Sequence, residues 1–297
     1  MKKVARYLVI GMGVLLVAML VTMCAVILVS KNREARTYAI RPEPIERAAG
    51  DEALSEGKRL FFARGCADCH AEDGTGKVIV DAAVGRFVGT NLSRVVRERS
   101  DEDLLRAIRH GISAEGKPLV LMPSKEYNRM SNREVARIIA FLRTLKPSKG
   151  VEERCEVRPL GRLLHVFGKM NLFNAEDIDH DETPPPAPEP AETVEYGAYL
   201  AIGCMSCHGE RLSGGPIPGA PVDAVGIPKN LTLHESGLKS WTKADFARAV
   251  REGKRPDGAA INPKFMPWTT LSHMSDVEVG AIWTYLESLE PLPFGGR

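Results

Sequence analysis

The chain has 297 residues, of which 44% are hydrophobic and 26% charged, so it has the composition of a globular protein with room for two domains. The formal net charge of +2 and the lack of a strong polybasic run argue against a nucleic-acid-binding protein. Function therefore has to be inferred from the motifs.

The N-terminal stretch predicts a membrane anchor. Residues 8–29 carry no charged side chain over 22 positions, and a membrane-spanning helix needs about 20. A cleavable signal peptide has a shorter apolar region of about 7–15 residues and a small-residue cleavage site, which the following "SKNREARTY" does not supply. We predict an uncleaved transmembrane anchor over residues 1–30 and a tether over residues 31–50, which contains Pro42 and Pro44.

A lipoprotein signal ending at Cys24 is the alternative interpretation of this stretch. It is disfavoured because Met23 stands where a small residue is expected, and because the apolar run continues past the cysteine. Basic residues flank both ends of the run almost equally, so the positive-inside rule does not settle its orientation.

The rest of the chain contains an internal sequence repeat of two copies. "GCADCH" at 65–70 and "GCMSCH" at 203–208 are each followed by an Asn-Leu pair, a short helix pattern, a Met-Pro pair and an amphipathic pattern that stops before proline. We predict two domains, residues 51–148 and 192–297, each of ordinary size. The connector, residues 149–191, is expected to pack its apolar first half on one or both domains and to extend through its Pro-rich second half.

The predicted fold class is all-α. Apolar residues recur at helical spacing before Pro147 and Pro291, and the capping-box sequence Ser-x-x-Glu opens each of these two helices at Ser131 and Ser275. Two further helices per domain are expected, one leading into CxxCH and one ending at a glycine. No convincing alternating strand pattern is found.

The CxxCH motifs allow three chemistries. A zinc site needs four ligands, and no further cysteine or histidine recurs in both copies. A redox dithiol needs only CxxC and explains neither the histidine nor the repeated methionine. CxxCH is the attachment signature of c-type haem. We therefore predict two covalently bound haems c, attached through two pairs of thioethers, with a histidine below each iron. The predicted attachment residues are Cys66, Cys69, Cys204 and Cys207, and the predicted proximal iron ligands are His70 and His208.

Each copy offers two methionines as the sixth ligand. Met130 and Met274 stand directly before the capping boxes, where an apolar residue often packs as a hydrophobic staple. Met122 and Met266 precede prolines, which favour an extended backbone. We predict Met122 and Met266 as the distal iron ligands, with core packing as the alternative role of any of these methionines.

Each copy resembles a class I cytochrome c domain in the helix entering CxxCH, the Asn-Leu segment, the Met-Pro loop and the C-terminal helix. The whole chain is similar to the membrane-anchored dihaem cytochrome c subunits of bacterial periplasmic dehydrogenases and oxidases. The resemblance implies that Asn91 and Asn230 support the haem, and that Phe61, Phe62, Tyr196 and Tyr199 pack as core. It also implies a bacterial inner-membrane location with both haem domains in the periplasm.

Two filled axial positions favour an electron carrier over an enzyme, because no iron position is left for substrate. We expect a non-catalytic dihaem cytochrome that moves electrons from a redox-protein donor to a membrane-bound acceptor, as a carrier or as a subunit of a larger respiratory complex. The alternatives are a dihaem peroxidase-like enzyme with one open or labile haem, and a haem sensor, for which no signalling domain is visible. Trp268 is left open between a propionate contact and packing, and Cys155 is interpreted as a lone thiol.

Overall fold

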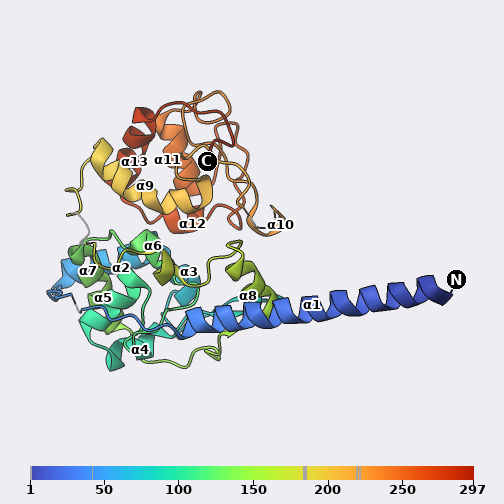
Figure 1. Cartoon of the computed structure of the whole chain (residues 1–297). Coiled ribbons are helices and arrows are strands. Elements are labelled where there is room, and N and C mark those ends of the chain that lie inside the picture. Colours follow the sequence, from blue (N-terminus) through green and yellow to red (C-terminus); the bar gives the residue numbers. More distant parts are fainter. Residues whose placement is uncertain (1, 42, 183–185, 219, 221) are drawn as a thin grey trace.

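The structure is a computed structural model that describes residues 2–41, 43–182, 186–218, 220 and 222–297. Two helical lobes lie side by side, and a long N-terminal helix projects away from the first of them (Figure 1). We call the elements from α2 to α7 the first lobe and those from α9 to α13 the second lobe. The predicted all-α class is confirmed, with one small sheet added. Of the Pro-rich part of the connector, residues 183–185 lie outside the described residues, as does Pro42 of the tether.

The first lobe contains six helices and two strands. They are α2 (Asp51–Ala63), α3 (Cys66–His70), β1 (Val78–Ala82), β2 (Gly85–Val88), α4 (Leu92–Glu98), α5 (Asp101–His110), α6 (Ser124–Tyr127) and α7 (Asn132–Thr144). The predicted capping box at Ser131 is present, since the Ser131 side chain accepts from the Glu134 amide. The helix α5 ends at Gly111, which adopts a left-handed conformation.

The second lobe repeats this plan. Its helices are α9 (Val194–His208), α10 (Val222–Val225), α11 (Lys243–Glu252), α12 (Trp268–Leu271) and α13 (Asp276–Ser288). Ser275 caps α13 through Glu278 as Ser131 caps α7, and Gly253 ends α11 as Gly111 ends α5. The repeat in the sequence is therefore a repeat in structure.

Glycines let the two main helices of each lobe cross closely. A Cβ on Gly57 of α2 would stand 1.9 Å from the Arg137 carbonyl oxygen on α7, and one on Gly197 of α9 would stand 2.0 Å from that of Ala281 on α13. Around these crossings lie the two main hydrophobic cores, one per lobe. Phe61 is fully buried and packs against the Phe141 ring at 5.5 Å, as expected from the sequence.

A three-stranded antiparallel sheet corrects the expectation that no strand would be found. β1 and β2 form a hairpin in the first lobe, and β3 (Glu156–Val157), from the connector, pairs with β2. The hairpin was missed because its strands are only four and five residues long, and β1 is mostly exposed. The sheet shows that the connector lies on the first lobe.

Three helical elements lie outside the two lobes as defined above. They are α1 (Lys2–Ala35), α8 (Pro159–Val166) and the 3-10 helix η1 (Asn174–Asp177). The helix α1 runs five residues beyond the predicted anchor and packs against α8. The tether is also docked, since the Tyr38 amide donates to the Gly116 carbonyl and Arg47 pairs with Asp101.

Candidate cofactor site between the lobes

The two CxxCH motifs are presented on helices, so that both cysteines of a pair face one side. In the first lobe Gly65 adopts a left-handed conformation with φ of 75°, and this turn separates α2 from the short α3 that carries Cys66 and Cys69. In the second lobe α9 runs through its motif without a break. Three residues make nearly one helical turn, which places the two thiols of each motif on the same face.

Both motif histidines are held in the orientation that a metal-binding imidazole needs. The Nδ1 atom of His70 lies 2.8 Å from the Thr90 carbonyl oxygen, and Nδ1 of His208 lies 2.7 Å from that of Lys229. A carbonyl can only accept, so Nδ1 carries the proton and Nε2 keeps its lone pair. Burial lowers the pKa of both imidazoles, which keeps them neutral.

The Asn-Leu segments fix these carbonyls in place. Asn91 and Asn230 follow the two acceptor residues directly and are each 1% exposed. Asn91 donates to the Ser148 carbonyl, and Asn230 donates to the Leu292 carbonyl, in each case just after the C-terminal helix of the lobe. These asparagines therefore join the end of each lobe to the backbone that orients its histidine.

The cysteines, histidines and methionines of both motifs line one cavity. Its volume is about 380 Å³, and its walls include all eight predicted site residues: Cys66, Cys69, His70, Met122, Cys204, Cys207, His208 and Met266. A second cavity of about 580 Å³ adjoins His208 and Met266. Met130 and Met274 also border the first cavity but are packed in the two cores at 6% exposure. Met122 and Met266 are less buried and belong to neither core.

The thiols do not have the character of reactive redox cysteines. Burial raises the pKa of Cys66 to about 12 and that of Cys204 to about 11, whereas a reactive thiolate needs a lowered pKa. Among the described residues, no group of three or more His, Cys, Asp or Glu side chains is placed to hold a metal ion. Paired thiols, a histidine with a free Nε2 and a thioether around one largely apolar cavity fit a covalently attached haem in each lobe.

The lobes make two corresponding contacts around this cavity. The Thr270 hydroxyl donates to the Asp68 carboxylate at 2.9 Å. The corresponding contact on the other side joins Ser206 and Glu126. Ser206 stands at the same motif position as Asp68. Glu126 and Thr270 each lie four residues after the methionine of their lobe, Met122 or Met266. Burial raises the pKa of Glu126. Each motif therefore contacts the methionine loop of the other lobe.

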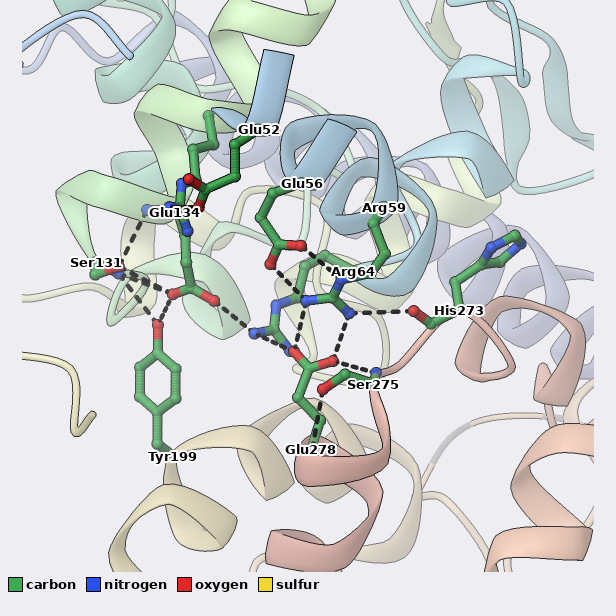
Figure 2. A network of polar contacts seen from close by, with 11 residues as sticks. Glu52, Glu56, Arg59, Arg64, Ser131, Glu134, Tyr199, His273, Ser275 and Glu278 are labelled. Atoms are coloured by element: carbon green, nitrogen blue, oxygen red, sulfur yellow. Dashed lines mark hydrogen bonds and ion pairs between the residues drawn. The ribbon is translucent and has the colours of Figure 1, made fainter. Parts of the chain in front are cut away.

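A buried ion-pair network joins the lobes beside the cavity (Figure 2). Arg64, which precedes the first motif, donates to Glu134 of its own lobe at 2.6 Å and to Glu278 of the other lobe at 3.5 Å. Arg59 donates to Glu278 at 2.5 Å, and the Tyr199 hydroxyl donates to Glu134. Both glutamates are the capping-box residues of their C-terminal helices, so the network ties the frameworks of the two lobes together.

Three aromatic residues make contacts that the sequence did not predict. Tyr199 and Phe62 pack against the cores of their lobes as expected, but the Tyr199 hydroxyl also reaches across to Glu134, and Phe62 also stacks on His273 of the other lobe with ring centres 4.8 Å apart. The Trp268 indole donates to the Ile261 carbonyl at 2.9 Å, which leaves it no proton for a propionate. Arg59 and Arg64 were missed, although an arginine directly before Gly-Cys in only one of the two copies was a visible signal.

Comparisons with known proteins give matches over both lobes. The sequence profile of the family "Cytochrome c" matches residues 54–146 and 194–290. The chain is 24% identical, over 83% of its length, to the fructose dehydrogenase cytochrome subunit of Gluconobacter japonicus, and 26% identical, over 82% of its length, to the cytochrome c subunit of a quinone alcohol dehydrogenase of Gluconacetobacter polyoxogenes. It spans only about half of these relatives, 54% and 57%. A dihaem c-type cytochrome of Cereibacter sphaeroides is 27% identical, over 74% of the chain and 80% of that protein.

Proposed function

Because the chain belongs to the cytochrome c family, we propose that it is a dihaem electron-transfer subunit that carries electrons from a periplasmic dehydrogenase to a membrane-bound acceptor. The observation that supports this most is the single cavity bordered by both CxxCH motifs. When bound, haem supplies one-electron chemistry between ferric and ferrous iron. The protein's part is to hold two such groups close together and in a fixed relation.

The residues that would do this are those placed around the cavity. Cys66 and Cys69 would hold one haem by thioether bonds, and Cys204 and Cys207 the other. His70 and His208 would present Nε2 to the two irons, oriented by the carbonyl contacts at Nδ1. Met122 and Met266 would supply the other ligand to each iron, and histidine–methionine ligation would give a higher reduction potential than bis-histidine ligation and leave no iron position for substrate. The subunit is thus non-catalytic in this proposal.

The helix α1 would anchor this unit in the bacterial inner membrane with both lobes in the periplasm. Its 34 residues are long and apolar enough to cross a membrane. The end of α1 is also docked on the folded part of the chain, since Val26 and Ser30 are buried and Glu34 pairs with Arg162. That docking favours a retained helix over a cleaved signal, because removal of α1 would expose its contact surface on α8. A dehydrogenase donor is suggested by the relatives' names.

The first test is the absorption spectrum of the full chain in detergent. We expect two haems per chain by the pyridine haemochrome assay, and a ferrous spectrum that carbon monoxide leaves unchanged. Met122→Ala and Met266→Ala should each make about half of the haem bind carbon monoxide. The controls Met130→Leu and Met274→Leu, which nearly conserve core volume, should stay insensitive.

Carbon monoxide binding by half of the haem in the unaltered protein would overturn the proposal for that lobe. One open or labile iron would instead favour the peroxidase-like alternative, and peroxide turnover would then be measured. If Met130→Leu rather than Met122→Ala opened the first site, the assignment of the distal ligand would be wrong, although the count of two haems would stand.

A further inference from the structure

The connector helix α8 carries an apolar stripe that is exposed at its two ends. Its members are Leu160, Leu163, Leu164 and Phe167. They stand at positions i, i+3, i+4 and i+7, which form one face of a helix and normally pack on a core. Here Phe167, just after the last turn of α8, is 61% exposed and Leu160 is 42% exposed, whereas Leu163 and Leu164 between them are half-buried. The side of α8 that is buried instead carries Gly161 and His165.

The stripe belongs to none of the three hydrophobic cores found in the described part of the chain. The rest of the apolar connector behaves differently, since Leu172 and Phe173 are fully buried in the core beside the sheet. The exposure of the stripe is therefore a local property of α8. It does not reflect a connector that has failed to pack.

The place where α8 meets α1 decides what the stripe faces. Val26 and Ser30 of α1 are buried at this contact. Arg162 of α8 fixes the crossing by donating to the Ser30 hydroxyl at 3.1 Å and pairing with Glu34 at 2.8 Å. Figure 1 shows α8 on the side of the first lobe toward which α1 projects.

The depth of this contact follows from helix geometry. With a rise of about 1.5 Å per residue, the uncharged residues 8–29 span about 33 Å, close to the hydrocarbon thickness of about 30 Å. Val29 then lies at the membrane boundary, and Val26 lies about 4.5 Å below it. An element that covers Val26 must itself reach the interfacial layer.

We propose that α8 is a second membrane contact, with its apolar stripe embedded in the interfacial layer of the bilayer beside α1. The proposal rests on the membrane anchoring proposed for α1. Amphipathic helices occupy this layer with their apolar face about 5–10 Å into the headgroup and acyl boundary. Lys31 and Lys169 flank the contact and are exposed, which suits anionic headgroups. The first lobe is thereby held against the membrane at two points.

The test is hydroxyl-radical footprinting of the full chain in nanodiscs of phosphatidylcholine and phosphatidylglycerol, with mass-spectrometric readout. Phe294 is the internal control, since it is 45% exposed against 61% for Phe167. In water Phe167 should therefore be oxidised faster than Phe294. Lipid coverage predicts the opposite, with Phe167 oxidised more slowly than Phe294. A faster oxidation of Phe167 would overturn the proposal.

A photoactivatable phospholipid gives the second readout. We expect it to label the peptide that contains α8, and we expect Phe167→Asp and Leu160→Asp each to reduce that labelling more than two-fold, whereas Phe294→Asp should not. Protection of Phe167 only after a dehydrogenase is added would identify a protein interface and overturn the lipid assignment. Oxidation of α1 would overturn the proposed anchoring by α1 as well. Protection of α1 together with oxidation of Phe167 would overturn the membrane contact of α8 alone. The haem count, measured on the same samples, tests the electron-transfer proposal independently.

Discussion

Substitution of Glu278 by glutamine tests whether the ion-pair network holds the lobes together. Glu278 is 1% exposed, receives hydrogen bonds from Arg59 and Arg64 of the other lobe, and caps α13 through the Ser275 amide at 2.7 Å. Glutamine has almost the same shape and also serves in a capping box. Glu278→Gln therefore removes the charge at the interface while keeping the cap.

The expected loss can be worked out from these contacts. A hydrogen bond to a charged group contributes about 1.5–3 kcal/mol net, and a neutral one about 0.5–1.5 kcal/mol. Neutralising Glu278 weakens the close Arg59 contact fully and the longer Arg64 contact partly, for a total of about 2 kcal/mol. At about 1.4 kcal/mol per tenfold change, the equilibrium between docked and separated lobes should shift about 30-fold.

Two measurements on the full chain in detergent check this value. Guanidinium unfolding gives the loss of stability, and circular dichroism in the Soret region reports the mutual orientation of the two haems. The matched control is Glu56→Gln, because Glu56 pairs with Arg59 within one lobe at 29% side-chain exposure, where an ion pair contributes at most about 1 kcal/mol. Equal behaviour of the two variants, with an unchanged Soret signal, would refute the role of Glu278 in docking.

Three further predictions concern pH, helix crossing and the Asn-Leu segment. Burial raises the pKa of Glu134, but Arg64 outweighs this effect and holds the pKa below its usual value. The stability that the ionised Glu134 contributes should therefore be complete above about pH 4.3 and lost as the pH falls through the lowered pKa. Glu134→Gln should lack this pH-dependent loss of stability in acid unfolding. Gly57→Ala should cost about 1–3 kcal/mol and lower the melting temperature seen by far-ultraviolet circular dichroism, because the added Cβ meets the Arg137 carbonyl; an unchanged transition would contradict the close crossing. Asn230→Ala should cost about 1–3 kcal/mol and reduce the haem-to-protein ratio, because the Leu292 carbonyl loses one of its two donors and the buried Thr232 amide loses its acceptor; a full haem complement at unchanged stability would argue against this role.

Local signals predicted most of each lobe. Capping boxes at Ser131 and Ser275 and stop signals at Gly111 and Gly253 act within a few residues, so their outcome does not depend on the rest of the fold. The repeat also predicted a matching set of motif and methionine residues in each lobe, but not that both sets border one cavity, because a repeat does not determine how its two copies pack together. The role of those residues as haem ligands remains a prediction.

Contacts between distant segments could not be predicted in the same way. Glu134 and Glu278 were visible as capping residues, but their second role depends on arginines more than 60 residues away in sequence. The pairing of Glu156–Val157 with β2 likewise depends on the path of the connector. Tyr199 has the spacing of a core residue, and only the approach of the other lobe gives its hydroxyl an acceptor.

The shared cavity has a consequence for the order of assembly. Its walls come from both lobes, and each motif is covered in part by the methionine loop of the opposite lobe. In the proposed function, enzymes that attach haem to Cys66 and Cys69, or to Cys204 and Cys207, would need access to that covered surface. Attachment at both motifs would then come before the lobes close and before the Arg64 network forms.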